Sequence, residues 1–252
     1  MASRTRLDQR LVELGLAPSR AKAQALIMAG LARIDGQTAR KPGQSVEPEA
    51  AVSVDGPEHP YVSRGGLKLA GALDHFGLDP AGLSCLDVGA STGGFTDCLL
   101  QRGAAEVTAV DVGYGQLAWK LRVDPRVKAI ERQNVRHMAI EVAPGPYGLI
   151  VMDVSFIGLR LVLPNITPRL ALGGRLLAMV KPQFEAGREH VGSGGVVRDA
   201  AARQQAVDGV ADCLRELGLE VLGQCPSPIL GPKGNVEIFL LAQKCAPSDA
   251  RP

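Results

Sequence analysis

Apolar runs of strand length alternate with helix-like segments from about residue 63 to near the end of the chain. Runs such as LIVMDV and LLAMVK are apolar almost throughout, which is typical of strands that have helices packed on both faces of a parallel sheet. The predicted strands occupy residues 83–89, 106–113, 126–131, 147–155, 174–181, 219–225 and 235–244. The predicted helices occupy residues 63–78, 91–103, 115–122, 159–172 and 199–218. The alternation predicts a Rossmann-like, doubly wound α/β domain, and we expect its last strand to run antiparallel as an edge strand of the mostly parallel sheet.

A different pattern precedes this domain. Residues 6–16 and 19–30 have apolar residues at helical spacing, and Ser19 is a suitable N-cap for the second of these helices. Residues 31–36 and 51–56 have the composition of short strands that end in Asp-Gly turns. A module of this size has a small core, so we expect it to be only marginally stable alone.

These patterns define the expected organisation of the 252-residue chain. We expect a small α+β domain over residues 1–57 and an α/β domain over residues 65–245. The stretch between them, residues 58–64, lies in a segment rich in proline and glycine and is the predicted linker. Residues 246–252 are the predicted tail.

Composition excludes several classes of protein. Hydrophobic residues make up 46% of the chain and charged residues 21%, the balance of a globular protein with a sizeable core. No apolar run approaches the roughly 18 residues that a membrane span needs, so we expect no stable membrane association. The five cysteines form no CxxC motif and the four histidines have no metal-like spacing, so we expect a cytoplasmic protein without disulfides or a metal.

Positive charge is concentrated at the start of the chain. Residues 1–46 contain eight Lys or Arg residues and three acidic ones, which favours a polyanionic partner for this module. The alternative is an ordinary solvated charged face. The candidate phosphate contacts are Arg4, Arg6, Arg20, Lys22, Arg33, Arg40 and Lys41.

Polar residues follow the predicted strands of the α/β domain at the points where the strands end. They are Asp87, Asp111, Asp153 and Lys181. Ligands of doubly wound sheets bind at the carboxyl ends of the strands, so this placement indicates an active site.

The first of these strand ends is the glycine-rich turn DVGASTGGF, which begins at Asp87. Such a turn lets a ligand approach the backbone closely, and Asp111 lies 24 residues further on, where an acidic residue accepts hydrogen bonds from ribose hydroxyls. Together they favour a cofactor that contains a nucleoside. The alternative is a tight turn that serves packing alone.

Five segments of the α/β domain resemble one family closely. The segments DVGASTGGF, AVDVGYGQLAW, MDVSF, VKPQFE and GNVEIFL are similar to those of the TlyA family, which methylates riboses of ribosomal RNA with S-adenosylmethionine and belongs with the FtsJ-like 2′-O-methyltransferases. The segment RLDQRLVELGLAPSRAKAQALIMAGLARIDG resembles the S4 RNA-binding domain. The resemblance covers nearly the whole chain. The family has an Arg-x-Trp-Val-like linker where this chain has His59-Pro60-Tyr61-Val62.

The resemblance implies a class I methyltransferase fold, S-adenosylmethionine as cofactor and a cytidine of ribosomal RNA as target. The implied cofactor-binding residues are Asp87, Gly89, Ser91, Thr92, Gly93, Gly94, Phe95, Asp111, Val112, Asn134 and Asp153. The implied catalytic residues are Lys68, Asp153, Lys181 and Glu237.

Roles for the four catalytic candidates follow from the chemistry of methyl transfer to a hydroxyl, which depends on alignment and on removal of the hydroxyl proton. We expect Lys181 to be the base or the hydroxyl-orienting group. The positive charge of Lys68 would make Lys181 lose its proton more easily, and Lys68 would also contact the RNA. Asp153 would hold Lys181, and Glu237 would fix the two lysines.

The glycine-rich segment over residues 182–199 is a candidate lid over the site. Phe184 in this segment is either a contact for an extruded base or a core residue, and Trp119 is expected in the core.

Two other functions remain as alternatives. The chain could be an RNA-binding ribosome assembly factor with an inactive methyltransferase fold, or a membrane-active haemolysin, a label that the family has carried. The sequence does not choose between free ribosomal RNA and an assembled ribosomal subunit as the partner, and it assigns no oligomeric state.

Overall fold

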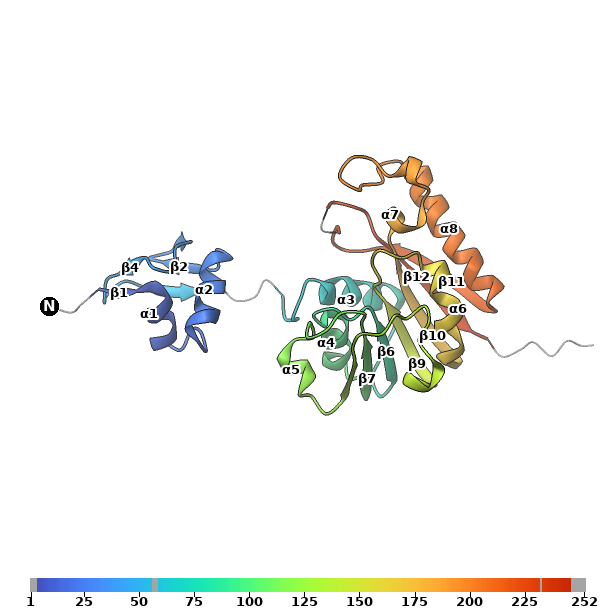
Figure 1. The fold of residues 1–252 in the computed structure, drawn as a ribbon, viewed down its shortest axis with the longest axis horizontal. Coiled ribbons are helices and arrows are strands. Elements are labelled where there is room, and N and C mark those ends of the chain that lie inside the picture. Colours follow the sequence, from blue (N-terminus) through green and yellow to red (C-terminus); the bar gives the residue numbers. More distant parts are fainter. Residues whose placement is uncertain (1–3, 56–58, 232, 246–252) are drawn as a thin grey trace, which may run out of the picture. The chain divides into compact units, whose positions relative to one another are not determined.

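The structure is a computed structural model that describes residues 4–55, 59–231 and 233–245. Contacts between residues divide the chain into two compact units, Met1–Pro60 and Tyr61–Pro252 (Figure 1). The tail predicted over residues 246–252 lies outside the described residues, as do Gly56 of the second predicted Asp-Gly turn and the first residue of the predicted linker.

The first unit is a small α+β module. Its elements are β1 (Thr5–Arg6), α1 (Leu7–Glu13), α2 (Arg20–Met28), β2 (Ala32–Ile34), β3 (Gln37–Ala39), β4 (Ser45–Val46) and β5 (Val52–Val54). Strand β2 pairs antiparallel with both β3 and β5, while β1 pairs with β4. The predicted helices and the strands β2 and β5 are confirmed. The equally short or shorter strands β1, β3 and β4 were not predicted, because, unlike β2 and β5, they have no apolar run that leads into an Asp-Gly turn.

Local sequence explains how these elements begin and turn. The Ser19 hydroxyl accepts a hydrogen bond from the backbone N–H of Lys22 and caps α2, as predicted. Asp35 and Gly36 both have left-handed φ values, 49° and 79°, which suit the tight hairpin turn between β2 and β3. Leu7 and Leu11 of α1 are fully buried in the core of the module, whereas Leu14, which follows the helix, is exposed.

The second unit contains the predicted α/β domain. Its helices are α3 (Gly65–Phe76), α4 (Gly94–Gln101), α5 (Trp119–Arg122), α6 (Leu163–Ile166), α7 (Pro182–Glu185) and α8 (Ala200–Glu216), with short 3-10 turns η1 (Ile140–Val142), η2 (Leu159–Leu161), η3 (Thr167–Arg169) and η4 (Arg188–His190). Its strands are β6 (Ser84–Val88), β7 (Glu106–Val110), β8 (Val127–Ile130), β9 (Tyr147–Met152), β10 (Leu170–Val180), β11 (Leu219–Pro226) and β12 (Ile238–Lys244).

These seven strands form one sheet in the order β11-β12-β10-β9-β6-β7-β8 (Figure 1). The strands from β10 through β8 are parallel, and β12 runs antiparallel between β10 and β11. The predicted class of fold, a mostly parallel doubly wound sheet, is therefore confirmed. The last strand is antiparallel, as expected, but it is not the edge strand, because β11 pairs along its outer side.

Each face of the sheet has its own apolar core. One core packs α3 and α4 against the sheet through residues such as Leu69 and Leu99. The other packs α6 and α8 through residues such as Ile166, Val210 and Leu214. Among the described residues, no helix combines the length and the apolar composition that a bilayer crossing requires.

Two predicted helices differ from the structure. The helix predicted over 159–172 is divided into η2, α6 and η3, since prolines 164 and 168 lack the backbone donors that a continuous helix needs, and its last residues belong to β10. The helix predicted over 115–122 is reduced to the single turn α5, because the backbone N–H of Ala118 donates to the Thr92 carbonyl oxygen and holds the preceding residues in a loop.

Candidate active site

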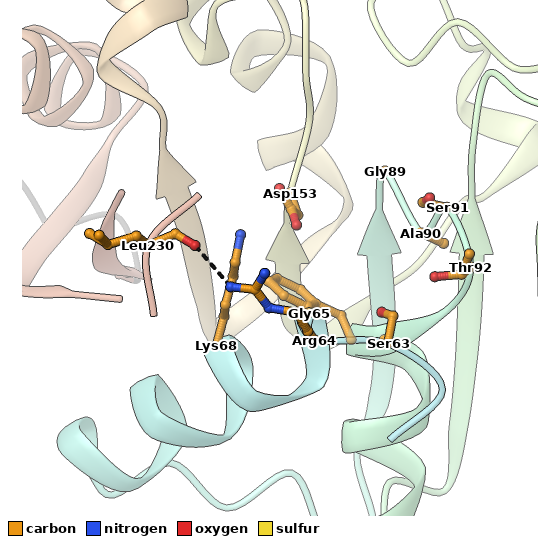
Figure 2. Close-up of a pocket in the computed structure, with 12 residues that line it drawn as sticks. Ser63, Arg64, Gly65, Lys68, Gly89, Ala90, Ser91, Thr92, Asp153 and Leu230 are labelled. Atoms are coloured by element: carbon orange, nitrogen blue, oxygen red, sulfur yellow. Dashed lines mark hydrogen bonds between the residues drawn. The ribbon is translucent and has the colours of Figure 1, made fainter. Parts of the chain in front are cut away.

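The carboxyl ends of the parallel strands open onto two adjoining cavities. The first has a volume of about 400 Å³ and is lined by Ser63, Arg64, Gly65, Lys68, Gly89, Ala90, Ser91, Thr92, Gly94, Phe95, Asp153 and Leu230 (Figure 2). The second has a volume of about 500 Å³ and is lined by Gly89, Ser91, Val110, Asp111, Val112, Gln116, Gln133, Asn134, Val135, Asp153, Val154, Ser155, Phe156 and Ile157. The two cavities share Gly89, Ser91 and Asp153, so they meet at the glycine turn after β6.

The glycine turn needs the backbone freedom of glycine at Gly89. This residue has a φ of +87°, and a Cβ atom built on it would lie 2.6 Å from the backbone oxygen of Asp153. The turn is joined to the end of β7 by Asp111, whose carboxylate accepts hydrogen bonds from the backbone N–H groups of Ser91 (2.8 Å) and Gly113 (2.7 Å). The ends of three neighbouring strands are thereby fixed around the point where the cavities meet.

Two of the predicted cofactor-binding residues, both within the turn, are absent from the described lining of both cavities. The carboxylate of Asp87 is fully buried, accepts a 2.6 Å hydrogen bond from the Thr96 hydroxyl, and has one oxygen without a hydrogen-bond partner. Burial raises the pKa of Asp87 to about 7, against the opposing effect of the Thr96 hydrogen bond. Gly93 packs against the side chain of Leu121 in α5.

The four predicted catalytic residues form two ion pairs. Lys68, in the first turns of α3, has its Nζ 2.5 Å from Oε2 of Glu237, and Lys181, after β10, has its Nζ 2.6 Å from Oδ1 of Asp153. Glu237 is 1% exposed, and both lysines are 8% exposed. The antiparallel direction of β12 explains the convergence, because Ile238 pairs with Val180 and so places the residues next to them at the same edge of the sheet.

Sequence reasoning did not assign a role to Ser155, whose hydroxyl accepts a 2.6 Å hydrogen bond from the Lys181 amine. The next residue, Phe156, is 92% exposed, has a left-handed φ of 65°, and lies with its ring centroid 5.5 Å from that of the half-buried Phe184. A bulky residue rarely has this backbone conformation, and only its position as the last residue of the segment MDVSF could have marked it in the sequence.

The expectation that Trp119 lies in the core is wrong. It begins the single turn α5 and is 74% exposed, since the residues before it are held in a loop by the hydrogen bond from the Ala118 N–H to the Thr92 carbonyl oxygen. Tyr114 in that loop is 67% exposed and lies under the guanidinium of Arg132, 4.0 Å from its ring centroid.

The basic residues of the first unit are held in different ways. Asp8 is fully buried and accepts hydrogen bonds from Arg6, Arg20 and Gln24, which holds the pKa of its carboxyl well below the usual range, chiefly through Arg6. Arg4 pairs with Glu47, and Arg33 pairs with Asp55 over 2.7 Å. Lys22, Arg40 and Lys41 are exposed and take part in no ion pair with the part of the chain that the structure describes.

Metal ligation has no candidate in the described segments, which contain no cluster of three or more His, Cys, Asp or Glu residues suited to an ion.

Comparison with known families gives a match for each unit. Residues 61–244 match the FtsJ-like methyltransferase family, and residues 5–52 match the S4 domain.

Individual relatives extend over nearly the whole chain. A Mycobacterium tuberculosis protein named 16S/23S rRNA (cytidine-2′-O)-methyltransferase TlyA is 51% identical over 95% of this chain and 90% of its own length. Hemolysin A of Brachyspira hyodysenteriae is 39% identical over 92% of this chain and 97% of its own length. A solved structure from Streptococcus thermophilus is 41% identical, with a TM-score of 0.74, and covers 96% of this chain and 89% of that one.

Proposed function

This chain belongs to the FtsJ-like methyltransferase family, and from that membership we propose that it transfers a methyl group from S-adenosylmethionine to a ribose 2′-hydroxyl, that of a cytidine, in ribosomal RNA. The observation that carries the proposal is the convergence of two lysine–carboxylate pairs at the edge of the two cavities. Residues 65–245 supply methyl transfer, residues 1–57 supply RNA binding, and residues 58–64 link them. The proposal implies that the enzyme meets ribosomal RNA in the cytoplasm.

The lining of the cavities fits S-adenosylmethionine, which supplies an activated methyl group when bound. The second cavity combines apolar walls, including Val110 and Val135, with the carboxylate of Asp111, a pattern suited to a nucleoside. Each oxygen of Asp111 accepts one backbone N–H and keeps a lone pair for a ribose hydroxyl. The residues proposed to hold the cofactor are Gly89, Ser91, Thr92, Gly94, Phe95, Asp111, Val112, Asn134 and Asp153. Asp87 and Gly93 stabilise the turn through their contacts with Thr96 and Leu121.

The four charged residues divide into two functional pairs. Lys181, in its neutral amine form, orients the 2′-hydroxyl and takes up its proton while the oxygen bonds to the methyl carbon, whose bond to the donor sulfur breaks. Asp153 holds Lys181 electrostatically and also lines both cavities, next to where the methyl donor is proposed to bind. Lys68 faces the first cavity and is fixed by Glu237, so it is placed to contact the RNA beside the reacting ribose (Figure 2).

Recognition of the RNA is proposed to begin with phosphate contacts from the first unit. Arg4, Arg6, Arg20, Lys22, Arg33, Arg40 and Lys41 supply positive charge there, which positions a nucleic acid without reading its sequence. At the catalytic cavity the exposed ring of Phe156 is better placed than the half-buried Phe184 to meet the base of an extruded nucleotide. The proposed substrate is ribosomal RNA, either free or in a ribosomal subunit.

Transfer of labelled methyl groups tests this function. We expect the purified protein to label ribosomal RNA or subunits at a ribose 2′-oxygen, and Lys181→Ala to lower kcat by about 10²–10⁴. Lys128→Ala is the matched control, since this exposed lysine of β8 lies outside both cavities, and it should keep kcat within about twofold of the parent. RNA binding without any transfer by the parent protein would instead identify an assembly factor.

A further inference from the structure

The amine of Lys181 has two neighbours that act on it differently. The Asp153 carboxylate lies 2.6 Å away as an ion pair, and such an attraction depends weakly on direction. The hydroxyl of Ser155, also 2.6 Å away, is the hydrogen-bond acceptor for this amine within the described chain. A hydrogen bond is strongly directional, so Ser155 sets the rotation of the amine about the Cε–Nζ bond of Lys181.

From this geometry we infer that Ser155 is a positioning residue for methyl transfer, which aims Lys181 at the ribose 2′-hydroxyl. The inference rests on the proposed function. One tetrahedral position of the amine nitrogen is directed at Ser155, and the carboxylate of Asp153 lies beside it. With Ser155 fixing the rotation, the two other positions of the amine nitrogen have set directions, and one of them is available to the ribose hydroxyl. Reacting groups held in line gain rate from this alignment.

The loop that carries Ser155 is fixed tightly enough for this role. At its start the backbone N–H of Asp153 donates to the Val88 carbonyl oxygen over 2.9 Å. At its end the backbone N–H of Leu159 donates to the buried carboxylate of Glu185 over 2.5 Å.

Between these two anchors, the ring of Phe156 contacts that of Phe184. The segments 153–159 and 181–185 are thus joined at three points: the Lys181 contacts, the two rings, and the Glu185 carboxylate.

A simple structural role for Ser155 makes a different prediction from a positioning role. A serine that only stabilises its loop affects unfolding and substrate affinity, and leaves the turnover of the folded, saturated enzyme intact. A serine that aims Lys181 affects kcat and leaves KM nearly unchanged, because the alignment matters in the transition state.

The test compares Ser155→Ala with Ser155→Thr, which keeps the hydroxyl on this exposed residue. We expect Ser155→Ala to lower kcat about 10–100-fold with KM for S-adenosylmethionine and for RNA within about threefold of the parent. Ser155→Thr should retain kcat within about threefold of the parent. Ser84→Ala is the matched control, since it also removes a 2.6 Å hydroxyl hydrogen bond to a charged side chain, Glu106, and lies outside both cavities.

Coupling to Lys181 provides a second readout. In a Lys181→Ala background, Ser155→Ala should cause no further loss of the single-turnover rate, because the serine acts only through the lysine. Parental kcat in Ser155→Ala, an equal loss in Ser155→Thr, or an effect confined to KM would each overturn the inference. Failure of the proposed function is distinguishable, because the parent protein would then transfer no methyl group to ribosomal RNA.

Discussion

At the scale of single residues, Asp87 couples the stability of the fold to pH. Its carboxyl is fully buried and has a pKa raised to about 7, mainly by burial and also by the nearby negative charges of Asp153 and Asp111. In an unfolded chain an aspartate titrates near pH 3.9. Between about pH 4 and pH 7 the folded protein therefore keeps a proton on Asp87 that the unfolded chain has released. The stabilising contribution of this residue is full below that window, falls as pH rises through it, and stays lost above it.

Asp87→Asn removes this titration and keeps the size of the side chain. We expect the free energy of unfolding of the variant, relative to the parent, to rise by about 1–4 kcal/mol between about pH 5 and about pH 8. Urea unfolding of both proteins at the two pH values measures the change. Asp208→Asn, on the exposed side of α8, is the control and should show no such rise. A difference between Asp87→Asn and the parent that is constant with pH would contradict this account.

At the scale of elements, Glu185 joins the segments after β9 and β10, which carry the proposed catalytic residues Asp153 and Lys181. It ends α7 and accepts the backbone N–H of Leu159 at the start of η2, with the guanidinium of Arg160 3.5 Å away. Gly158 permits this approach, since a Cβ atom there would lie 3.1 Å from the carboxylate. Burial raises the pKa of Glu185. The segment after β9 and the segment after β10 are held together at this point.

Removal of the Glu185 carboxylate should therefore affect both stability and turnover. Glu185→Ala leaves the Leu159 N–H without its acceptor, and we expect a loss of about 1–3 kcal/mol in the free energy of unfolding together with a lower kcat. Glu185→Gln keeps an acceptor oxygen and should recover most of both. Denaturant unfolding and methyl-transfer assays on the same preparations measure the two effects. Equal stability of Glu185→Ala and the parent would show that other contacts hold these loops together.

The same two loops show what a sequence can predict and what it cannot. Buried parallel strands are apolar on both faces, so β9 and β10 could be predicted, and with them the meeting of Asp153 and Lys181 at one sheet edge. The hydrogen bond of Ser155 depends on the exact path of a loop with no periodic pattern, and the sequence gives no signal for that path. The exposure of Trp119 has the same origin, because the loop before α5 is placed by tertiary hydrogen bonds and not by helix propensity.

At the scale of the whole molecule, the excess of basic residues and the proposed catalytic residues lie in different units. The first 46 residues contain eight basic and three acidic residues, whereas the two lysine–carboxylate pairs lie in the second unit. Within the first unit, Asp8 occupies one side of Arg6 and of Arg20, while Lys22, Arg40 and Lys41 are exposed. If this unit supplies the phosphate contacts, its exposed residues should govern RNA affinity and its dependence on salt, while methyl transfer on saturated enzyme should depend on the second unit.

The triple variant Lys22→Ala, Arg40→Ala and Lys41→Ala tests this division. Each lost phosphate contact should reduce the slope of log affinity against log salt concentration by about 0.7–0.9, so we expect a total reduction of about 2–3 for the three residues. Binding of a ribosomal RNA fragment, measured across a salt series, gives the slope. Arg215→Ala, which removes an exposed arginine from α8, is the control and should leave the slope unchanged.

Because phosphate contacts position the RNA before any chemistry occurs, the triple variant should have a higher KM for RNA and a turnover at saturating RNA near the parental value. An unchanged salt slope in the triple variant would show that other residues supply the phosphate contacts.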